Sequence, residues 1–404
     1  MQRGSGSFLT PVYIASFLYQ ASQNIYGPFL PVFAATLGAS YLQIGIIGLA
    51  GSLIQVPTSL VFGRYSERLP VKRLMWLACV LAASTIALLS LVQNVAEIVG
   101  LLFLVGLGSG MFWPTTDALV SEVAVSQPRE KVLGRYSASW GTGLLVGPLL
   151  GGYVVTYFGY RGVFLVSAVT LSICLATVLL RITPHYSSRP IRKVDRPDPT
   201  GTTVGKRPNR FAVAALAVIT SFLLGMIYLI FPRYAASLSI TPIQLGYLFS
   251  TYAVTRLMLF FMSHRVAMVG IVKSLGLSLV LLAIAGAILG LASNFYVFLV
   301  AFLILGVSAG IEIPLIMNLY ARTNSGKGMT RTMGIYETVT GAGIVSGSFS
   351  GGAISNYVSP AVPYLMTAVV ALATFPIVVV AGRGDSSSER SVPADEQVPD
   401  PVHE

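Results

Sequence analysis

The chain contains the stretch GRYSASWGTGLLVGPLLGG at residues 134–152, and its glycine spacing occurs again in GIYETVTGAGIVSGSFSGG at residues 334–352. Five glycines hold the same places in both copies, and Ser348 of the second copy replaces Pro148 of the first. These glycines are Gly134, Gly143, Gly147, Gly151 and Gly152, repeated as Gly334, Gly343, Gly347, Gly351 and Gly352. In an apolar helix, small residues at such spacings allow close backbone packing. The repeat predicts two halves with one architecture.

Composition indicates a membrane protein. The chain is 54% hydrophobic and 10% charged, with a mean hydropathy of +0.76, which is unlike a soluble domain. Its formal net charge is +11, but the basic residues lie in short segments between apolar runs, which indicates membrane topology rather than nucleic-acid binding. Cys79 and Cys174 lie in separate apolar runs and the three histidines are scattered, so we expect no disulfide framework, metal site or cofactor.

Twelve apolar stretches are long enough to cross about 30 Å of hydrocarbon. With both termini on one side of the membrane, all Lys and Arg residues except Arg161, Arg233 and Arg256 lie in segments on that side, which predicts cytoplasmic termini. The expected spans are 9–36, 41–63, 74–93, 98–120, 134–157, 162–182, 211–236, 242–262, 271–291, 296–320, 333–356 and 361–382.

The spans divide into two groups of six. We expect a first bundle over 1–182, a cytoplasmic connector rich in Pro, Gly and basic residues over 183–210, and a second bundle over 211–383. An acidic tail over 384–404 has the composition of a disordered segment. The predicted fold class is therefore an all-α membrane protein with twelve helices in two pseudo-symmetric bundles.

The complete helix-five spacing, including Pro148, resembles the antiporter motif of major facilitator superfamily transporters, and most strongly that of drug/proton exporters. The resemblance covers the chain apart from the connector and the tail. It implies a secondary transporter in which two bundles rock about a central site to alternate access. No Walker loop, catalytic carboxylate pair or nucleophile–base arrangement appears in the sequence, so we expect no enzymatic activity.

The segment between the second and third spans resembles, in degenerate form, the loop motif of the same superfamily. Glu67 stands where the family has aspartate, and Pro70 replaces a glycine. An acid–base pair in this loop locks the two halves when the cavity opens outward, through charge-assisted hydrogen bonds. The residues that the resemblance assigns to this cytoplasmic gate are Gly63, Glu67, Arg68, Arg73 and Glu122.

Polar and aromatic residues on several spans are candidates for the wall of a central cavity. In the first span, Gln20, Gln23 and Asn24 share one face with Gly27. They either hold helices together or line the cavity, and the superfamily resemblance favours the cavity. Asp117 is expected near the cytoplasmic interface, where it would end or orient its helix. The substrate-binding candidates are Gln20, Gln23, Asn24, Trp113, Tyr228, Tyr252 and Arg256.

Three charged residues are expected inside the second bundle. At about 1.5 Å per residue, Arg256, Glu312 and Glu337 reach similar depths, and the superfamily places their helices side by side. A charge inside the membrane marks a functional site unless it belongs to a static ion pair. Arg256 would pair with one carboxylate and leave the other as proton carrier, because burial and a like charge favour the neutral form. We expect Glu312 to take this role, with Glu337 as the second proton-coupling residue.

The sequence therefore predicts a plasma-membrane secondary transporter that exports small amphipathic compounds in exchange for protons. Its partners would be a small-molecule substrate, protons and the lipid bilayer, and we expect a monomer that does not bind nucleic acid. One alternative is proton-coupled uptake or exchange of an organic anion, with Arg256 as counter-charge. Another is a transporter-like sensor or lipid-moving protein without coupled transport.

Overall fold

The computed structural model describes residues 9–65, 70–123, 129–182, 209–262, 270–323 and 329–382. Nearly all of these residues are helical. The helices are α1 (Thr10–Tyr26), α2 (Leu30–Thr36), α3 (Tyr41–Tyr65), α4 (Val71–Leu89), α5 (Val95–Val123), α6 (Arg129–Arg181), α7 (Arg210–Ser237), α8 (Pro242–Phe261), α10 (Ile271–Leu291), α11 (Phe295–Thr323), α12 (Met329–Tyr357), α13 (Val362–Ala373) and α14 (Phe375–Gly382).

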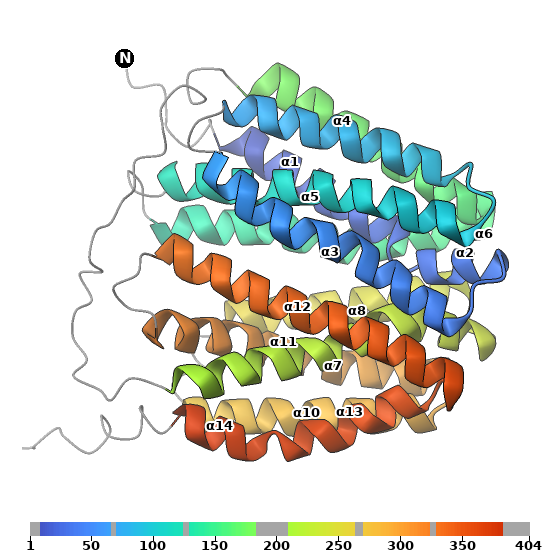
Figure 1. Cartoon of the computed structure of the whole chain (residues 1–404), viewed down its shortest axis with the longest axis vertical. Coiled ribbons are helices and arrows are strands. Elements are labelled where there is room, and N and C mark those ends of the chain that lie inside the picture. Colours follow the sequence, from blue (N-terminus) through green and yellow to red (C-terminus); the bar gives the residue numbers. More distant parts are fainter. Residues whose placement is uncertain are drawn as a thin grey trace, which may run out of the picture.

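The two halves of the chain form two helical bundles (Figure 1). Helices α1 to α6 make the first bundle and α7 to α14 the second, stacked with their helices running roughly along one direction. Each expected span has a counterpart: α1 and α2 share the first, and α13 and α14 share the last. Helix α6 contains two spans, which separate at Gly159, where φ is 73°. The predicted pair of six-helix bundles is confirmed.

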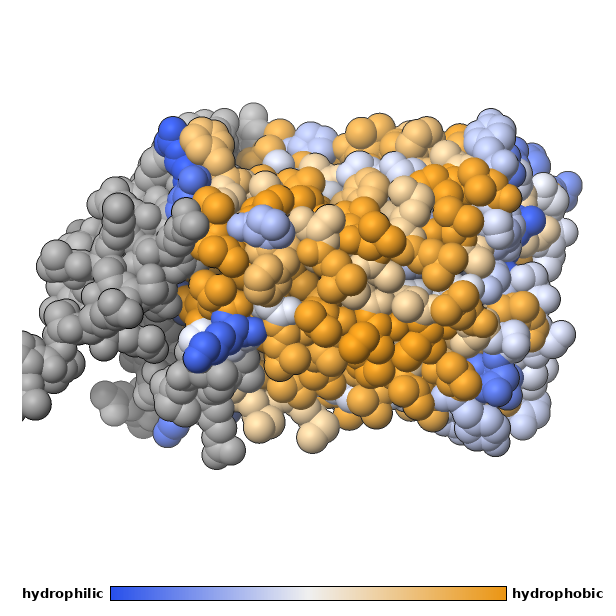
Figure 2. Space-filling view, turned by 90° about the horizontal axis from the view of Figure 1, so that it is seen from below, coloured by the Kyte–Doolittle hydropathy of each residue, from blue (hydrophilic) through white to orange (hydrophobic). Residues whose placement is uncertain are grey.

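Length and hydropathy alone identify seven of the described helices as able to cross a membrane, or eight if the pair α13 and α14, bent by 40°, counts as one. This number is below twelve because α6 combines two expected spans and α1 has only 17 residues. Helices α8 and α12 are also less hydropathic, because α8 carries Arg256 and α12 is rich in Gly, Ser and Thr. A broad apolar belt nevertheless covers the face seen in Figure 2, between more polar ends. Such a belt is the surface expected to contact lipid tails.

Local sequence explains where several helices begin and bend. Thr241 caps α8 in a reciprocal capping box with Gln244, and Pro242 occupies the first turn. The Asn209 side chain caps α7 by accepting from the backbone N–H groups of Phe211 and Ala212. Prolines inside long helices, such as Pro148 in α6, are tolerated in membrane helices because neighbouring groups satisfy the freed backbone.

The repeated glycines serve two kinds of packing. In the first bundle, a Cβ added to Gly147 would lie 2.6 Å from the Asn24 Cβ and 2.8 Å from the Ala21 carbonyl oxygen. Gly143 also packs against α1, so these glycines hold α6 against α1 within one bundle. By contrast, a Cβ on Gly152 would lie 2.6 Å from the Pro242 carbonyl oxygen of the other bundle. Gly147 therefore packs within the first bundle, whereas Gly152 contacts the second.

The second copy of the motif repeats this division. A Cβ on Gly347 would lie 1.9 Å from the Phe222 carbonyl oxygen of α7, within the second bundle. A Cβ on Gly352 would lie 2.6 Å from the Tyr41 carbonyl oxygen of α3, in the first bundle. In both halves the earlier glycine joins neighbours inside a bundle, and the final glycine joins the two bundles.

Contacts between bundles are concentrated at the end of the molecule that carries Tyr41 and Pro242. The Tyr153 and Tyr247 hydroxyls lie 2.8 Å apart, and the Ser250 hydroxyl donates to the Leu145 carbonyl oxygen at 2.8 Å. At the same end, Arg233 donates to the Ala39 carbonyl oxygen and lies 4.3 Å from the centre of the Tyr41 ring. This end, hereafter the closed end, is sealed by close backbone contact and by hydrogen bonds.

The two cysteines meet in the core of the first bundle. Cys79 of α4 and Cys174 of α6 are free and buried, with their Sγ atoms 3.6 Å apart. The sequence does not predict this contact. Each cysteine lies in its own apolar run, and such a run predicts a helix but not the helix that packs against it.

Candidate functional site

A polar region lies between the bundles, toward the end of the molecule opposite the closed end. Asp117 of α5 and Glu337 of α12 are both exposed, although their helices run through the centre of the molecule. They come from opposite bundles and lie close enough to interact electrostatically. A Cβ added to Gly134 of α6, nearer the start of that helix, would meet nothing within 4 Å. Solvent therefore reaches both carboxylates, which come from opposite bundles.

Arg256 of α8 is the charged centre of this region. It is half-buried, and its guanidinium carbon lies 6.0 Å from the centre of the Tyr252 ring. The side chains of Tyr228, Tyr252 and Tyr336 lie near enough to the guanidinium to interact with it. Within the described part of the chain, no carboxylate oxygen lies within 4.0 Å of an Arg256 nitrogen. Arg256 therefore does not form the direct ion pair with Glu312 or Glu337 that the sequence suggests, and Glu337 interacts with it only at longer range.

The Tyr228 hydroxyl is an unsatisfied group in the same cluster. It is buried close to Tyr252 and Arg256, yet it has no hydrogen-bond partner of acceptable geometry. The rings of Tyr228 and Tyr252 contact edge to face, with centroids 5.2 Å apart. A buried hydroxyl without a partner is costly. The cluster thus has one free donor beside its cation.

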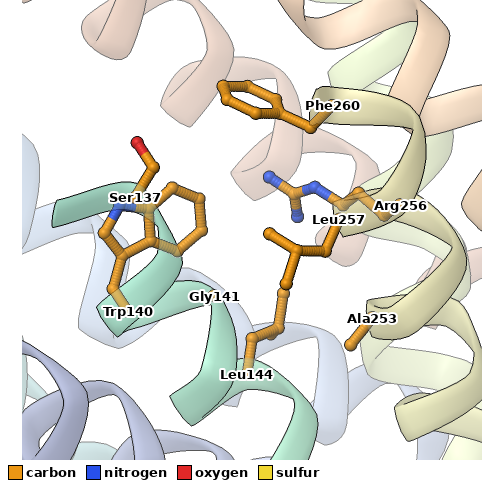
Figure 3. Close-up of a pocket in the computed structure, with 8 residues that line it drawn as sticks. All are labelled: Ser137, Trp140, Gly141, Leu144, Ala253, Arg256, Leu257 and Phe260. Carbon is orange, nitrogen blue, oxygen red and sulfur yellow. The ribbon is translucent and has the colours of Figure 1, made fainter. Parts of the chain in front are cut away.

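A pocket opens beside Arg256 between one helix of each bundle (Figure 3). The guanidinium points into the space between Trp140 and Phe260. The cavity volume of this pocket is only about 10 Å³, about the least that holds one water molecule. It is therefore a narrow slot in this conformation. Its lining residues are Ser137, Trp140, Gly141 and Leu144 of α6, and Ala253, Arg256, Leu257 and Phe260 of α8.

Glu312 of α11 occupies a different environment. Its side chain is only 3% exposed, and its hydrogen-bonding neighbour is Thr220 of α7. The Thr220 hydroxyl already donates to the Leu216 carbonyl oxygen at 2.9 Å. A hydroxyl has one proton to donate but can still accept. A protonated Glu312 can therefore donate to Thr220, whereas an ionised Glu312 would compete with Leu216 for the Thr220 proton.

The polar residues expected in the first bundle form an internal network. Gln23 donates from Nε2 to the Ser109 hydroxyl at 3.0 Å and accepts from the Tyr26 hydroxyl at 2.6 Å. The Tyr19 hydroxyl lies 3.2 Å from the Ser109 hydroxyl, and its ring contacts Trp113 edge to face at 5.7 Å. These bonds join α1 to α5 and satisfy Gln23 within the bundle.

Gln20 and Asn24, the other two candidate residues of the first span, pack against α6. Asn24 donates from Nδ2 to the Gln20 carbonyl oxygen at 2.8 Å, and both residues are half-buried. Their Cβ atoms also pack against Gly143 and Gly147. The structure thus brings Gln20, Gln23, Asn24 and Trp113 together in one bundle, and Tyr228, Tyr252 and Arg256 together in the other.

Asp117 does not end its helix, which continues to Val123. It accepts a hydrogen bond from the Tyr136 hydroxyl at 2.6 Å and so connects α5 to α6. Of the two expected roles, ending the helix is wrong, and the bond to Tyr136 fits the other, which is to orient α5 against its neighbour.

The predicted cytoplasmic gate falls mainly outside the described residues. Glu67 and Arg68 lie beyond them, as does the side chain of Glu122, and of Gly63 only the helical backbone is described. Arg73 is described and is exposed in the first turn of α4. The gate therefore stays a prediction.

Several residues of the site were not identified from the sequence. Trp140 and Phe260 line the pocket. Thr220 lies beside Glu312, and Tyr336 interacts with the three charged residues of the second bundle. One signal was available for α6: Ser137, Gly141 and Leu144 follow helical spacing beside Trp140. Such a stripe marks one face of a helix but does not say which charged residue will oppose it.

Comparisons with known proteins agree with this architecture. A family model described as "Major Facilitator Superfamily" matches residues 12–235 and again residues 213–404. A multi-drug resistance efflux pump PmrA homolog of Lactococcus lactis is 31% identical over 185 residues. The multidrug resistance protein MdtG of Serratia proteamaculans is 30% identical over 192 residues. Each match covers 45% of this chain and 45% of the relative, so the aligned region spans about half of each curated relative.

Solved structures share the fold at low sequence identity. The crystal structure of a peptide transporter, POT, in complex with sulfate gives a TM-score of 0.75 at 12% identity, and covers 93% of this chain and 95% of that one. The human organic anion transporter MFSD10 gives a TM-score of 0.66 at 16% identity, and covers 93% and 100%. The repeated family match, the two bundles and these neighbours agree. This chain belongs to the Major Facilitator Superfamily.

Proposed function

We propose that this protein is a secondary active transporter that exports small amphipathic compounds in exchange for protons. Family membership supports a transporter, and the relatives named as multidrug resistance and efflux proteins support export. The helix-five motif, complete with Pro148, resembles that of drug/proton exporters, and so it also supports export in exchange for protons. The substrate passes between the bundles, next to the pocket lined by α6 and α8.

The observation that carries proton coupling is the burial of Glu312 beside Thr220. A carboxyl that is neutral in this conformation can lose its proton when the bundles move and admit water. Glu337, which is exposed and within electrostatic reach of Arg256, offers a second carboxyl at the bundle interface. Proton release from Glu312 would then be tied to the change in access.

Alternating access requires two states, and a molecule closed at this end represents one of them. With both termini cytoplasmic, as the distribution of Lys and Arg favours, the closed end faces outward and the polar region opens to the cytoplasm. A plasma-membrane monomer in this orientation collects its substrate from the cytoplasm. Breaking the contacts of the closed end, and forming the gate around Glu67 and Arg68, would complete the cycle.

The test is transport in proteoliposomes with an imposed pH gradient and the membrane potential clamped at zero. The probes are naphthalene derivatives with a fixed charge, one carrying a sulfonate and one a trimethylammonium group, so that pH does not change their ionisation. Protein-free liposomes are the control. Exchange predicts that liposomes acidic inside accumulate at least one probe, because protons leave as the probe enters.

The sign of the gradient separates the alternatives. Proton-coupled uptake of an organic anion requires liposomes that are acidic outside; Arg256 favours this alternative, since it forms no direct ion pair with a described carboxylate. Accumulation under that gradient alone would replace export by uptake. No probe movement under either gradient would leave a sensor or lipid-moving role and refute coupled transport of these compounds.

A further inference from the structure

We propose that the slot between α6 and α8 binds flat aromatic anions, with the anionic group on Arg256 and the ring between Trp140 and Phe260. The proposal rests on the transport function proposed above and names the class of substrate. The ligand would carry a carboxylate, sulfonate or phosphate next to a planar apolar body.

The first support is that Arg256 forms no direct ion pair with any described carboxylate. Arginine stays protonated in proteins, and a charge within a membrane span is costly unless it is paired or wet. Among the described residues, Tyr228, Tyr252 and Tyr336 interact with the guanidinium, Glu337 acts on it only at longer range, and no carboxylate oxygen lies within 4.0 Å of it. Tyrosine hydroxyls orient the guanidinium without neutralising it. The planar guanidinium therefore remains free to bind a carboxylate, sulfonate or phosphate through two parallel hydrogen bonds.

The second support is the shape and chemistry of the slot. Trp140 and Phe260 stand on either side of the guanidinium tip in Figure 3, and Leu257 adds an apolar wall. Ser137 contributes a hydroxyl at the rim. Aromatic side chains pack well against a planar ring. An apolar body with one anionic end thus matches the slot better than a cation, which Arg256 would repel.

The third support is that the slot belongs to both bundles. Trp140 comes from α6 and Arg256 from α8, so a bound ligand bridges the two halves. The slot is narrow where Gly141 faces Leu257: a Cβ on that glycine would lie 2.8 Å from the Leu257 Cδ1. Separation of α6 from α8 would widen it to admit a ring. Ligand binding and bundle movement are then coupled through the same pair of helices.

The experiment measures binding to the purified full chain in lipid nanodiscs by titration calorimetry. Three naphthalene probes differ only in one group, which is a sulfonate, a trimethylammonium or a hydroxymethyl. We expect the sulfonate to bind about tenfold or more tightly than the hydroxymethyl probe, since it alone forms a charge-assisted pair. In Arg256→Gln this preference disappears, whereas Arg256→Lys keeps part of it. Trp140→Ala weakens all three probes together.

The control variant is Arg210→Gln, which removes an exposed arginine that lies over the Phe211 ring, away from the slot. It should leave the preference for the sulfonate unchanged. Equal binding of the sulfonate and hydroxymethyl probes to the wild-type chain would overturn the proposal, as would tighter binding of the cation. An unchanged preference in Arg256→Gln would also overturn it.

Two features keep the test decisive. The selectivity of the wild-type chain needs no variant, so it stands even if Arg256→Gln fails to fold. Binding is measured without a pH gradient and is therefore independent of proton coupling. Anion binding without gradient-driven accumulation would refute the proposed function but support this site, and gradient-driven accumulation without anion preference would do the reverse.

Discussion

Gly246 of α8 packs directly on Pro148 of α6: a Cβ at Gly246 would lie 2.5 Å from the Pro148 carbonyl oxygen. The two residues belong to different bundles, and their contact lies at the closed end. The proline that completes the helix-five motif thus sits where the two halves touch. A side chain at Gly246 must push the bundles apart, since the opposing atom is backbone and cannot move by itself.

Gly246→Val is therefore expected to open the closed end. Spin labels at 158 and 358 measure this opening, since Phe158 and Val358 are 75% and 70% exposed and belong to opposite bundles. The distance between the labels should lengthen in double electron–electron resonance measurements. Gly100→Val is the matched control, because a Cβ at Gly100 meets nothing within 4 Å. An unaltered distance distribution in Gly246→Val would show that this contact does not hold the end closed.

Arg233 is expected to stabilise the same end by a smaller amount. It donates to Ala39 and lies over Tyr41, both across the bundle interface. Arg233→Gln should raise the population with the closed end open about fivefold, which corresponds to about 1 kcal/mol of lost interaction. The control is Arg161→Gln, since Arg161 donates to the Val92 carbonyl oxygen at 3.1 Å within the first bundle. If both variants shift the label distance equally, the loss of a surface charge explains the effect.

Gly147→Leu is expected to destabilise the first bundle rather than the contact between bundles. The new side chain would collide with Asn24 and Ala21 of α1, and overpacking of this kind costs about 1–3 kcal/mol. Thermal unfolding in detergent should show a lowered midpoint, while Gly134→Leu, where a Cβ meets nothing within 4 Å, should unfold near the wild-type temperature. Normal stability together with altered proton coupling would instead assign Gly147 a direct role in exchange.

Glu312→Gln is expected to preserve exchange of unlabelled for labelled probe but to lower gradient-driven accumulation by about tenfold or more, because glutamine cannot release a proton. Glu337→Gln should have a weaker effect on accumulation. Glu337 is exposed, so its protein surroundings influence its proton affinity less than those of a buried carboxyl do. Counterflow and pH-jump assays in proteoliposomes separate the two activities. Gradient-driven accumulation at the wild-type level in Glu312→Gln would remove this residue from proton coupling, and a larger loss in Glu337→Gln would transfer the role to Glu337.

The sequence by itself determined the architecture of this protein. The glycine spacing repeats at residues 134–152 and 334–352, and apolar runs separated by basic segments predict two groups of six spans. Both signals are local: each needs only the periodicity of one helix and the cost of burying charge. The same reasoning placed Arg256, Glu312 and Glu337 at similar depths, because depth follows from the rise per residue.

Only the tertiary structure decided which faces meet. It placed Gly147 against α1 and Gly152 against α8, although both belong to one motif. It put tyrosines instead of carboxylates around Arg256, set Thr220 beside Glu312, and brought Trp140 of one bundle to the arginine of the other. A helical stripe reveals what one helix offers to a neighbour, but the neighbour is chosen by how whole helices cross, which depends on packing summed over both bundles.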